Sequence, residues 1–262
     1  MRIARYVHEG EVAFGVVESG AVADDGGVEP EVGEIVGHPF GALTFSGVRH
    51  PLASVKLLAP VLPSKVVAIG RNYAAHASEM GGEVPDRPLI FLKPSTAVTG
   101  SGDNIAYPPS SQRVDYEGEL AVVIGRLCRD VPEERAAEVV FGYTCANDVT
   151  ARDQQKADGQ WSRAKGYDSF CPLGPWIETD VDIADLRLTT TLNGEVKQDG
   201  RTSSIVHKVP ALIAYITSCM TLLPGDVILT GTPEGVGPMS IGDEVAVDIE
   251  GIGRLVNRVV ER

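Results

Sequence analysis

The sequence predicts an α+β protein in which β-strands predominate and helices are few and short. Apolar runs rich in Val and Ile recur along the chain and stop at Gly, as at residues 65–70 and 120–125. The 29 glycines and 17 prolines among 262 residues indicate many turns. Helical patterns are confined to three short stretches, at residues 73–80, 132–140 and 209–216.

Length, charge and cysteine content exclude several classes of protein. A chain of 262 residues suits one large domain plus a small one, and its net charge of −13 argues against a nucleic-acid or anionic-membrane surface. The N-terminus lacks a signal-peptide core, and no apolar run is long enough to span a bilayer. The cysteines are far apart and fit reduced thiols of a cytoplasmic protein: Cys128, Cys145, Cys171 and Cys219.

Residues 1–60 predict a small β-rich N-terminal domain. Two strand-like runs, at residues 3–8 and 12–17, flank a turn and so predict a hairpin, and residues 24–27 predict a further turn. Polar chemistry is sparse in this part, which we interpret as a scaffold or an interface. The proline-punctuated stretch 59–64 predicts the boundary to the second domain, residues 61–262.

The first helical pattern, at residues 73–80, carries a possible acid–base pair. Asn72 is a candidate N-cap, and the glycines that follow the pattern predict its end. His76 and Glu79 are three residues apart and therefore share one helix face. A carboxylate beside an imidazole can orient it as a general base. The alternative is a solvent-exposed pair without function. A short helix that ends in Gly-Gly could also be a mobile lid.

The stretch 114–125 predicts a strand with two glutamates on one face. Side chains alternate along a strand, so Glu117 and Glu119 point to the same side, and Gly118 between them lets another segment approach closely. Buried carboxylates cost several kcal/mol unless they are paired or bind a cation. Carboxylates suit Mg²⁺ or Mn²⁺, and Asp148 is a candidate third ligand. The alternative is an edge strand whose glutamates face water.

The remaining elements follow from shorter signals. Residues 183–194 alternate and end in Asn-Gly, which predicts a hairpin strand, and residues 209–216 carry an apolar helical stripe. A Gly- and Thr-rich turn at residues 230–238 follows an apolar strand and offers donors that suit a carboxylate. Residues 244–249 and 253–260 predict the closing strands.

Several of these stretches together resemble the fumarylacetoacetate hydrolase family. The resemblance runs in unbroken order over roughly residues 65–260, and the matching pieces are GRNY (70–73) with His76, FLKP (91–94), DYEGEL (115–120), NDVTARD (147–153), KG (165–166) and LTGTP (229–233). The N-terminal unit resembles the extra β-region of short bacterial members. The resemblance implies an α+β roll of stacked mixed sheets for residues 61–262, usually in a homodimer.

The resemblance also implies roles for individual residues. Glu117, Glu119 and Asp148 match the ligands of a divalent metal, usually Mg²⁺ or Mn²⁺. His76 and Glu79 match the lid dyad that activates water in hydrolytic members, and Lys165 matches the cation beside the substrate oxyanion. Further positions match substrate contacts: Gly231 and Thr232 for a carboxylate, and Arg71, Lys93 and Gln160 in the pocket.

These roles predict an enzyme acting on small anionic 2-oxo acids. A metal that binds the carboxylate and 2-oxo oxygens stabilises the adjacent enolate. That enolate serves decarboxylation of oxaloacetate or hydrolytic C–C cleavage of acylpyruvates such as fumarylpyruvate. It equally serves a 2-hydroxyhepta-2,4-diene-1,7-dioate isomerase of aromatic catabolism. An alternative of another class is a non-enzymatic protein with a structural cation site.

Overall fold

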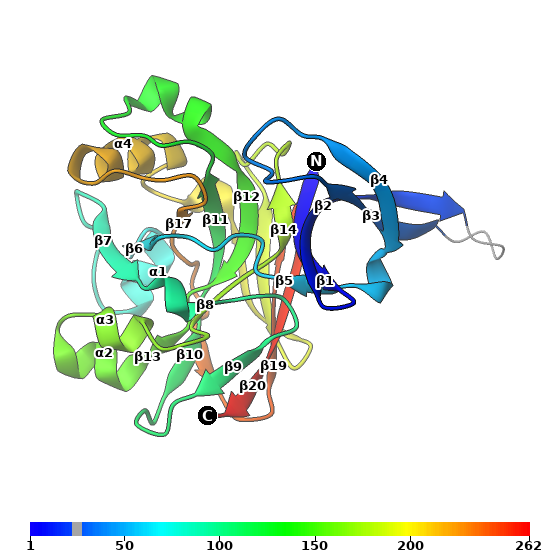
Figure 1. The fold of residues 1–262 in the computed structure, drawn as a ribbon. Coiled ribbons are helices and arrows are strands. Elements are labelled where there is room, and N and C mark those ends of the chain that lie inside the picture. Colours follow the sequence, from blue (N-terminus) through cyan, green and yellow to red (C-terminus); the bar gives the residue numbers. More distant parts are fainter. Residues whose placement is uncertain (23–27) are drawn as a thin grey trace.

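The computed structural model describes residues 1–22 and 28–262 and arranges them in three β-sheets with short helices at their margins (Figure 1). The turn predicted at residues 24–27 lies outside the described residues. Strands dominate the described part, and the helices are short, as the sequence predicts. The predicted fold class, a mainly β roll of stacked mixed sheets, is therefore confirmed.

The largest sheet has twelve strands in the described part of the chain. The N-terminal strands form one of its edges, and strands from the second part of the chain form the other. Its path runs through β4 (Phe45–Pro51), β3 (Val28–Ile35), β2 (Glu11–Val22), β1 (Arg2–His8), β14 (Cys171–Glu178), β12 (Val140–Asn147), β11 (Gly118–Ile124), β17 (Val227–Leu229), β6 (Val66–Gly70) and β7 (Leu89–Lys93). Off this path, β5 (Lys56–Leu58) pairs with β1, and β8 (Val98–Thr99) pairs with β14. Most neighbours are antiparallel, but β6 and β17 run parallel.

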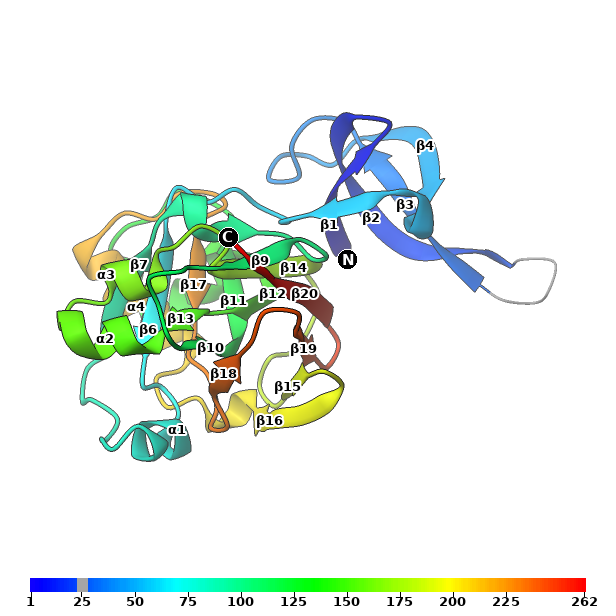
Figure 2. The same ribbon diagram turned by 90° about the horizontal axis from the view of Figure 1, so that it is seen from below.

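Two smaller sheets complete the roll. One has the order β16 (Glu195–Arg201), β15 (Arg187–Leu192), β19 (Glu244–Ile249), β20 (Gly253–Glu261) and β9 (Asn104–Tyr107), and the other has the order β13 (Thr150–Ala151), β10 (Val114–Tyr116) and β18 (Gly237–Met239). The α-helices of the described residues are α1 (Ala74–Glu79), α2 (Arg152–Asp158), α3 (Ser162–Lys165) and α4 (Val209–Cys219), and the 3₁₀ turns are η1 (Leu52–Ser54), η2 (Ser95–Ala97), η3 (Glu133–Val139) and η4 (Thr202–Ser204). Helices α2 and α3 lie side by side (Figures 1 and 2).

The centre of the large sheet is buried on both faces. Along β11, Ala121 and Val123 pack into one apolar cluster, while Val122 and Ile124 pack into another that α4 and η3 cover. Period-2 alternation explains this division. Since both faces of β11 are covered, its side chains are uniformly apolar from residue 120 to 124, as the sequence pattern indicates.

The N-terminal strands β2, β3 and β4 form a lobe that projects from the rest of the molecule (Figure 2). The predicted hairpin is present, because β1 and β2 pair from Arg2 opposite Val17 to His8 opposite Glu11. Strand β1 also pairs with β14, which connects the lobe to the central sheet. The domain boundary near residue 60 stays a prediction.

Two local predictions require correction. The stretch 132–140 forms the 3₁₀ turn η3 and not an α-helix. Asn72 does not cap α1, whose N-cap residue is Tyr73. The Asn72 side chain instead donates to the carbonyls of Thr230 and His207 and accepts the N–H of His207, so tertiary contacts take up its hydrogen-bonding groups.

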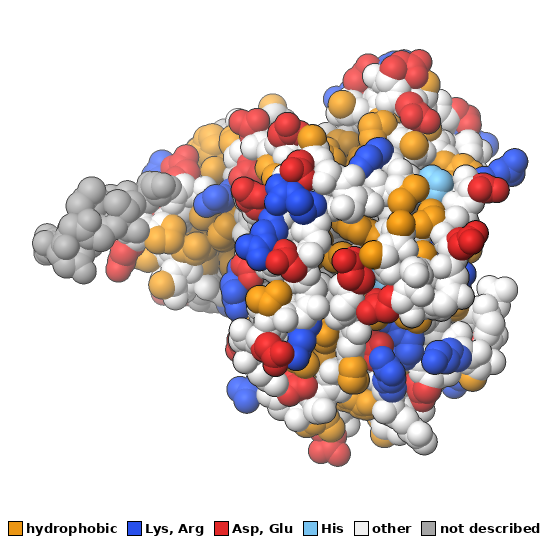
Figure 3. Space-filling model, turned by 180° about the vertical axis from the view of Figure 1, so that it is seen from behind, with side chains coloured by type: hydrophobic (Ala, Val, Ile, Leu, Met, Phe, Trp, Pro, Cys, Tyr) orange, Lys and Arg blue, Asp and Glu red, His pale blue; other side chains and the backbone are white. Residues whose placement is uncertain are grey.

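On the face shown in Figure 3, acidic and basic side chains are interspersed. Exposed ion pairs between neighbouring strands, such as Arg187 with Asp199, contribute to such mixing. The described part of that face offers no continuous basic surface. Among the described residues, moreover, the helices are too short or too polar to cross a bilayer.

Asp226 is a buried carboxylate that ties the start of β17 to the start of β6. It accepts hydrogen bonds from Ser64 N–H, Ser64 Oγ and Leu223 N–H and forms an ion pair with Lys65. Burial by itself raises the pKa of Asp226, but the bonds from Lys65, Ser64 and Leu223 outweigh it and lower the pKa below its usual value. The charged form of Asp226 therefore stabilises the junction between the two parallel strands.

We expect Asp226→Ala to lower the free energy of unfolding at pH 7 by about 3 kcal/mol, in the range for breaking a buried ion pair. A carboxyl whose pKa is depressed in the folded state stabilises above its unfolded pKa, and that contribution is lost as pH falls. The difference between wild type and variant should therefore shrink below about pH 4. Urea unfolding at pH 7 and pH 3.5 measures it. The exposed Asp168, changed to Ala, is the control, and an equal loss in both variants would refute the role of Asp226.

Candidate metal centre

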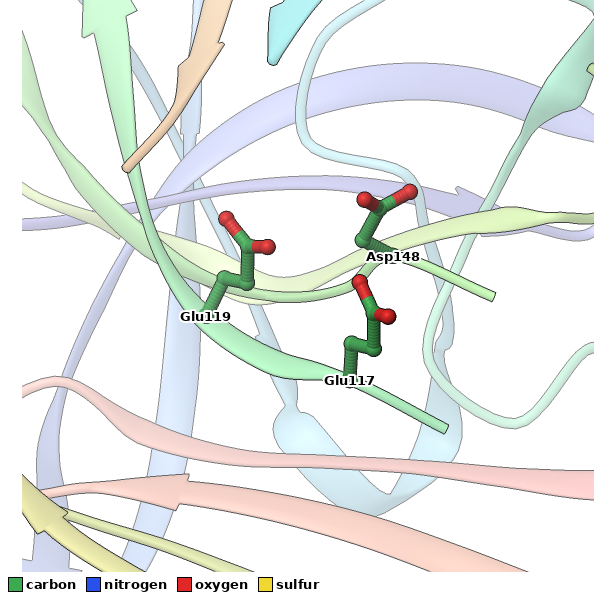
Figure 4. Close-up of side chains that lie close together, drawn as sticks. All are labelled: Glu117, Glu119 and Asp148. Carbon is green, nitrogen blue, oxygen red and sulfur yellow. The ribbon is translucent and has the colours of Figure 1, made fainter. Parts of the chain in front are cut away.

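Three carboxylates converge at the point where β10 gives way to β11 (Figure 4). Glu117 lies between the two strands, Glu119 lies on β11, and Asp148 follows β12. One oxygen from each lies within 4.8 Å of the others. All are buried, with exposed fractions of 4%, 2% and 1%. Because β11 is an interior strand with β12 and β17 on its flanks, the alternative of an edge strand with solvated glutamates is excluded.

Local hydrogen bonds hold together the backbone segments that carry the three carboxylates. Gly118 pairs opposite Asn147, whose Oδ1 accepts the N–H of Glu117 at 2.9 Å. The N–H of Asp148 donates to the carbonyl of Glu117 at 2.8 Å. On the opposite face, a Cβ at Gly118 would collide with Oγ1 of Thr190 from β15. The predicted close approach of another segment at Gly118 is therefore present.

Three buried cations form ion pairs with two of the three carboxylates and with the neighbouring Asp115. The ammonium of Lys165 donates to Glu117 at 2.7 Å and also to Asp148. The guanidinium of Arg152 pairs with Glu117 and with Asp115, and Lys93 pairs with the other oxygen of Asp148. Glu119 differs, since among the described residues its carboxylate receives the N–H of Gly231, at 2.6 Å, and no salt bridge.

These contacts shift the pKa values in opposite directions. Burial raises the pKa of Glu117, but the charges of Lys165 and Arg152 outweigh it, so the net pKa lies well below the usual range. The pKa of Glu119 is raised well above its usual value, by burial and by the charges of Asp148 and Glu117. Burial lowers the pKa of Lys165, but the charges of Asp148 and Glu117 raise it by more. The net pKa therefore lies above its usual value, and Lys165 stays protonated at neutral pH.

The residues present fit a divalent cation. Glu119 is a buried carboxylate without a cationic partner in the described chain, and its charge is opposed by two other carboxylates. A hard divalent ion among the three oxygens would supply the missing positive charge, and carboxylate oxygens are the ligands that Mg²⁺ and Mn²⁺ prefer. The N–H of Gly231 holds the Glu119 carboxylate, and the hydrogen bond from the Asp148 N–H to the Glu117 carbonyl holds the other two segments together. The three carboxylates point toward one another (Figure 4).

The predicted dyad on α1 is formed at the edge of the same site. His76 is buried, and its Nδ1 lies 3.2 Å from Oε2 of Glu79. The other oxygen of Glu79 accepts the N–H of Gly235 at 3.0 Å. Glu79 is therefore held from a second segment, and among the described residues the imidazole has a hydrogen-bond partner at Nδ1 and none at Nε2. The alternative of a freely solvated pair does not fit a histidine that is only 6% exposed.

A cavity of about 230 Å³ connects the dyad with the carboxylates. It brings most of the predicted site residues together: Arg71, His76, Glu117, Glu119, Asp148, Lys165 and Thr232. Its volume lies below the roughly 300 Å³ at which pockets for drug-sized ligands begin, so it suits a small metabolite.

Three predicted substrate contacts lie elsewhere. Gln160 is exposed and follows Gly159, the C-cap residue of α2. Lys93 is fully buried behind Asp148, where it pairs with that carboxylate. Gly231 directs its N–H to Glu119. These three groups do not line the cavity.

Residues that were not predicted as substrate contacts also line the cavity. Arg152 and Gln155 lie three apart on α2 and are hydrogen-bonded at 2.8 Å, and Lys156 and Trp161 also line the cavity. Trp161 packs edge-on against Phe91 with ring centroids 5.2 Å apart. Neither Arg152 nor Gln155 is among the predicted site residues, although a spacing of three places them on one face of a helix that starts at Arg152.

Comparison with known protein families divides the chain between two models. A model described as fumarylacetoacetate (FAA) hydrolase C-terminal matches residues 65–260, and one described as Rv2993c-like, N-terminal, matches residues 1–60. Among curated relatives, the chain is 54% identical over 265 residues to Protein Rv2993c of Mycobacterium tuberculosis, covering 100% of this chain and 99% of that protein. It is 44% identical over 242 residues to the mitochondrial oxaloacetate tautomerase FAHD2A of Bos taurus, covering 84% and 77% respectively.

Solved structures show the same fold. The crystal structure of 5-carboxymethyl-2-hydroxymuconate delta-isomerase from Mycobacterium smegmatis superimposes with a TM-score of 0.92 at 52% identity, covering 100% of both chains. Fumarylpyruvate hydrolase from Pseudomonas aeruginosa, in complex with Mn²⁺ and pyruvate, gives a TM-score of 0.72 at 34% identity, covering 76% of this chain and 90% of that one. Proteins similar to this chain thus include a tautomerase, an isomerase and a hydrolase.

Proposed function

The chain belongs to the fumarylacetoacetate hydrolase family, and from this premise we propose that it is a divalent-metal-dependent enzyme acting on small 2-oxo dicarboxylic acids. One observation carries the proposal. Three buried carboxylates line the same small cavity as His76, whose ring is hydrogen-bonded to Glu79. A purely structural ion has no need of such a cavity or of a base beside it.

The charge balance of the site favours a dianionic substrate. The site carries four negative and four positive charges. The negative charges lie on Glu117, Glu119, Asp148 and Asp115, and the positive charges lie on Lys93, Lys165, Arg152 and Arg113. A bound divalent ion would therefore leave the centre with an excess of two positive charges. A 2-oxo dicarboxylate carries two negative charges at neutral pH. Such a local excess is what attracts an anion to a chain whose net charge is −13.

Glu117, Glu119 and Asp148 would hold the ion, Mg²⁺ or Mn²⁺, which when bound supplies Lewis-acid polarisation of substrate oxygens. Lys165 lies against two of these carboxylates, whose charges raise its pKa. In its charged form it would stabilise negative charge that develops on the substrate. Arg152, held by Glu117 and Gln155, places further donors at the cavity wall.

His76 is the residue that would move the proton. Its Nδ1 is occupied by Glu79, which fixes the ring and leaves Nε2 as the nitrogen that exchanges a proton with water or substrate. In hydrolysis of an acylpyruvate it would deprotonate the attacking water. In isomerisation it would transfer a proton between carbon or oxygen atoms of the substrate.

Decarboxylation of oxaloacetate or hydrolytic C–C cleavage is the first candidate reaction, and keto–enol or double-bond isomerisation is the second. The second is favoured by the similarity to an oxaloacetate tautomerase and to a 5-carboxymethyl-2-hydroxymuconate delta-isomerase. Proton transfer alone suffices for isomerisation, and one oriented histidine in the same cavity as a lysine suits it.

We expect the purified protein with Mg²⁺ or Mn²⁺ to act on at least one of oxaloacetate, acetylpyruvate and a 2-hydroxydienedioate when these are assayed side by side. Spectra distinguish the outcomes, since loss of CO₂, cleavage and enol decay give different products. EDTA should abolish turnover while changing the melting temperature little. A large loss of melting temperature without any turnover would contradict the proposal and favour a structural cation site.

We further propose a homodimer and a cytoplasmic location. Light scattering during chromatography would measure the mass of the protein in solution, which can be compared with the 27.8 kDa of one chain. A monomer at micromolar concentration would rule out the dimer.

A further inference from the structure

Gln198 is a buried amide on β16 that lies directly behind the carboxylate site. Its exposed fraction is 1%, and it does not line the cavity. Its Oε1 accepts the N–H of Gly118 at 2.9 Å, and its Nε2 donates to Oγ1 of Thr232 and to the carbonyl of Pro233, both at 2.8 Å. Both ends of the amide are therefore engaged, and they join β11 to the turn that follows β17.

Thr232 closes a ring of hydrogen bonds around Gly118. Its hydroxyl donates to the carbonyl of Gly118 at 2.8 Å and accepts from Gln198, so its proton is committed to the backbone. The N–H and the carbonyl of Gly118 are thus held by two side chains. These side chains replace a strand partner, because the pairing of β17 with β11 ends at Leu229 opposite Ala121. Without them, both polar groups of a buried residue would lack partners.

Gly118 is the residue between Glu117 and Glu119, so its orientation sets the direction of both glutamate side chains. We propose that Gln198 is a positioning residue for the metal centre: it holds Gly118 and Thr232 so that Glu117 and Glu119 present their carboxylates to one divalent ion. The inference rests on the proposed function, because it assumes that the carboxylates bind a cation. Residues that orient metal ligands without touching the metal typically change affinity by roughly 10–100-fold when they are replaced.

Asn257 on β20 offers a matched control. It too is a buried amide, with an exposed fraction of 2%, and its Nδ2 donates to the carbonyls of Gly100 and Asp103 at 2.8 Å each. It neither lines the cavity nor contacts the carboxylates. Replacing it by Leu removes a comparable set of buried hydrogen bonds elsewhere in the fold.

The test compares Gln198→Met, Asn257→Leu and wild type, each freed of metal by chelation. Mn²⁺ affinity is measured by calorimetry or by the free-Mn²⁺ electron paramagnetic resonance signal, and melting temperature without metal is measured beside it. Gln198→Met should bind Mn²⁺ roughly 10–100-fold more weakly than wild type. Asn257→Leu should melt earlier and keep the wild-type affinity. Saturating Mn²⁺ should restore most of the kcat of Gln198→Met, because the variant keeps every group that faces the cavity.

Equal Mn²⁺ affinities of Gln198→Met and wild type would overturn the inference, and so would equal weakening in Gln198→Met and Asn257→Leu. If Gln198→Met does not fold, Thr232→Val decides: it removes the hydroxyl that links Gln198 to Gly118 and should weaken Mn²⁺ binding about tenfold, and an unchanged affinity would refute the role of the ring. A wild type that binds no Mn²⁺ would overturn the metal centre and this inference together. A wild type that binds Mn²⁺ but converts none of the substrates would contradict only the proposed reaction.

Discussion

Glu119→Gln should remove stoichiometric Mn²⁺ binding and reduce turnover to background on all substrates. Glu119 is the carboxylate of the site that lacks a salt bridge within the described chain, whereas Glu117 and Asp148 are already paired with cations. It therefore contributes most of the uncompensated negative charge that attracts a cation. The loss in affinity should exceed the roughly 10–100-fold typical of a residue behind a metal ligand. Calorimetric titration with Mn²⁺ and steady-state kinetics measure the two effects.

The same variant should be at least as stable as wild type when both are free of metal. The raised pKa of Glu119 means that the fold disfavours its charged form, because of burial and of Asp148 and Glu117. A neutral amide of the same shape removes that repulsion, and added Mn²⁺ should raise the melting temperature of wild type slightly and leave that of the variant unchanged. Glu134→Gln, at an exposed position on η3, serves as the control. Retained stoichiometric Mn²⁺ and normal turnover in Glu119→Gln would show that the metal lies elsewhere.

His76→Ala should separate hydrolysis from decarboxylation. Hydrolysis of an acylpyruvate needs a base to deprotonate water, and removal of a general base costs roughly 10²–10⁴-fold. Decarboxylation of oxaloacetate needs mainly a place for the electrons left on the substrate, which Lys165 and the cation would stabilise. We therefore expect kcat/KM to fall by roughly 10²–10⁴-fold for acetylpyruvate and far less for oxaloacetate.

Glu79→Gln provides the companion variant, because it keeps a side chain that can contact His76 Nδ1 and Gly235 N–H but removes the charge. A smaller loss of the same kind is expected there. Unimpaired hydrolysis in His76→Ala would mean that water is activated without this histidine. Equally large losses on both substrates would mean that His76 positions substrate or closes α1 over the cavity.

Local periodicity predicted the parts of the site that depend on one element. Alternation along a strand placed Glu117 and Glu119 on one side and Gly118 on the other, and helical spacing brought His76 to Glu79. The structure bears out both placements, because they follow from backbone geometry within a few residues. The convergence of Asp148 was expected from the family resemblance and depends on the pairing of β11 with β12.

Tertiary contacts decided what the sequence pattern missed. Asn72 had the chemistry of an N-cap, but its amide binds backbone groups of two distant segments. Gln155 lies on α2 and lines the cavity, whereas Gln160 lies beyond the end of that helix, is exposed and does not line it. The three cations around the carboxylates come from separate elements, and no spacing in the sequence reveals that they meet.

The parallel pairing of β6 with β17 also constrains how the chain is made. Strand β17 fills the position between β6 and β11, so the central sheet cannot close until residues 227–229 have been synthesised. At about 5–20 residues per second, this takes between roughly ten and thirty seconds after β6 has emerged from the ribosome. During that interval β6 and β11 expose unpaired edges that are apolar on both faces, a condition that favours aggregation and chaperone binding. Co-expressed chaperones should therefore raise the yield of folded protein, since the carboxylate site is assembled only when Gly231 and Thr232 reach β11.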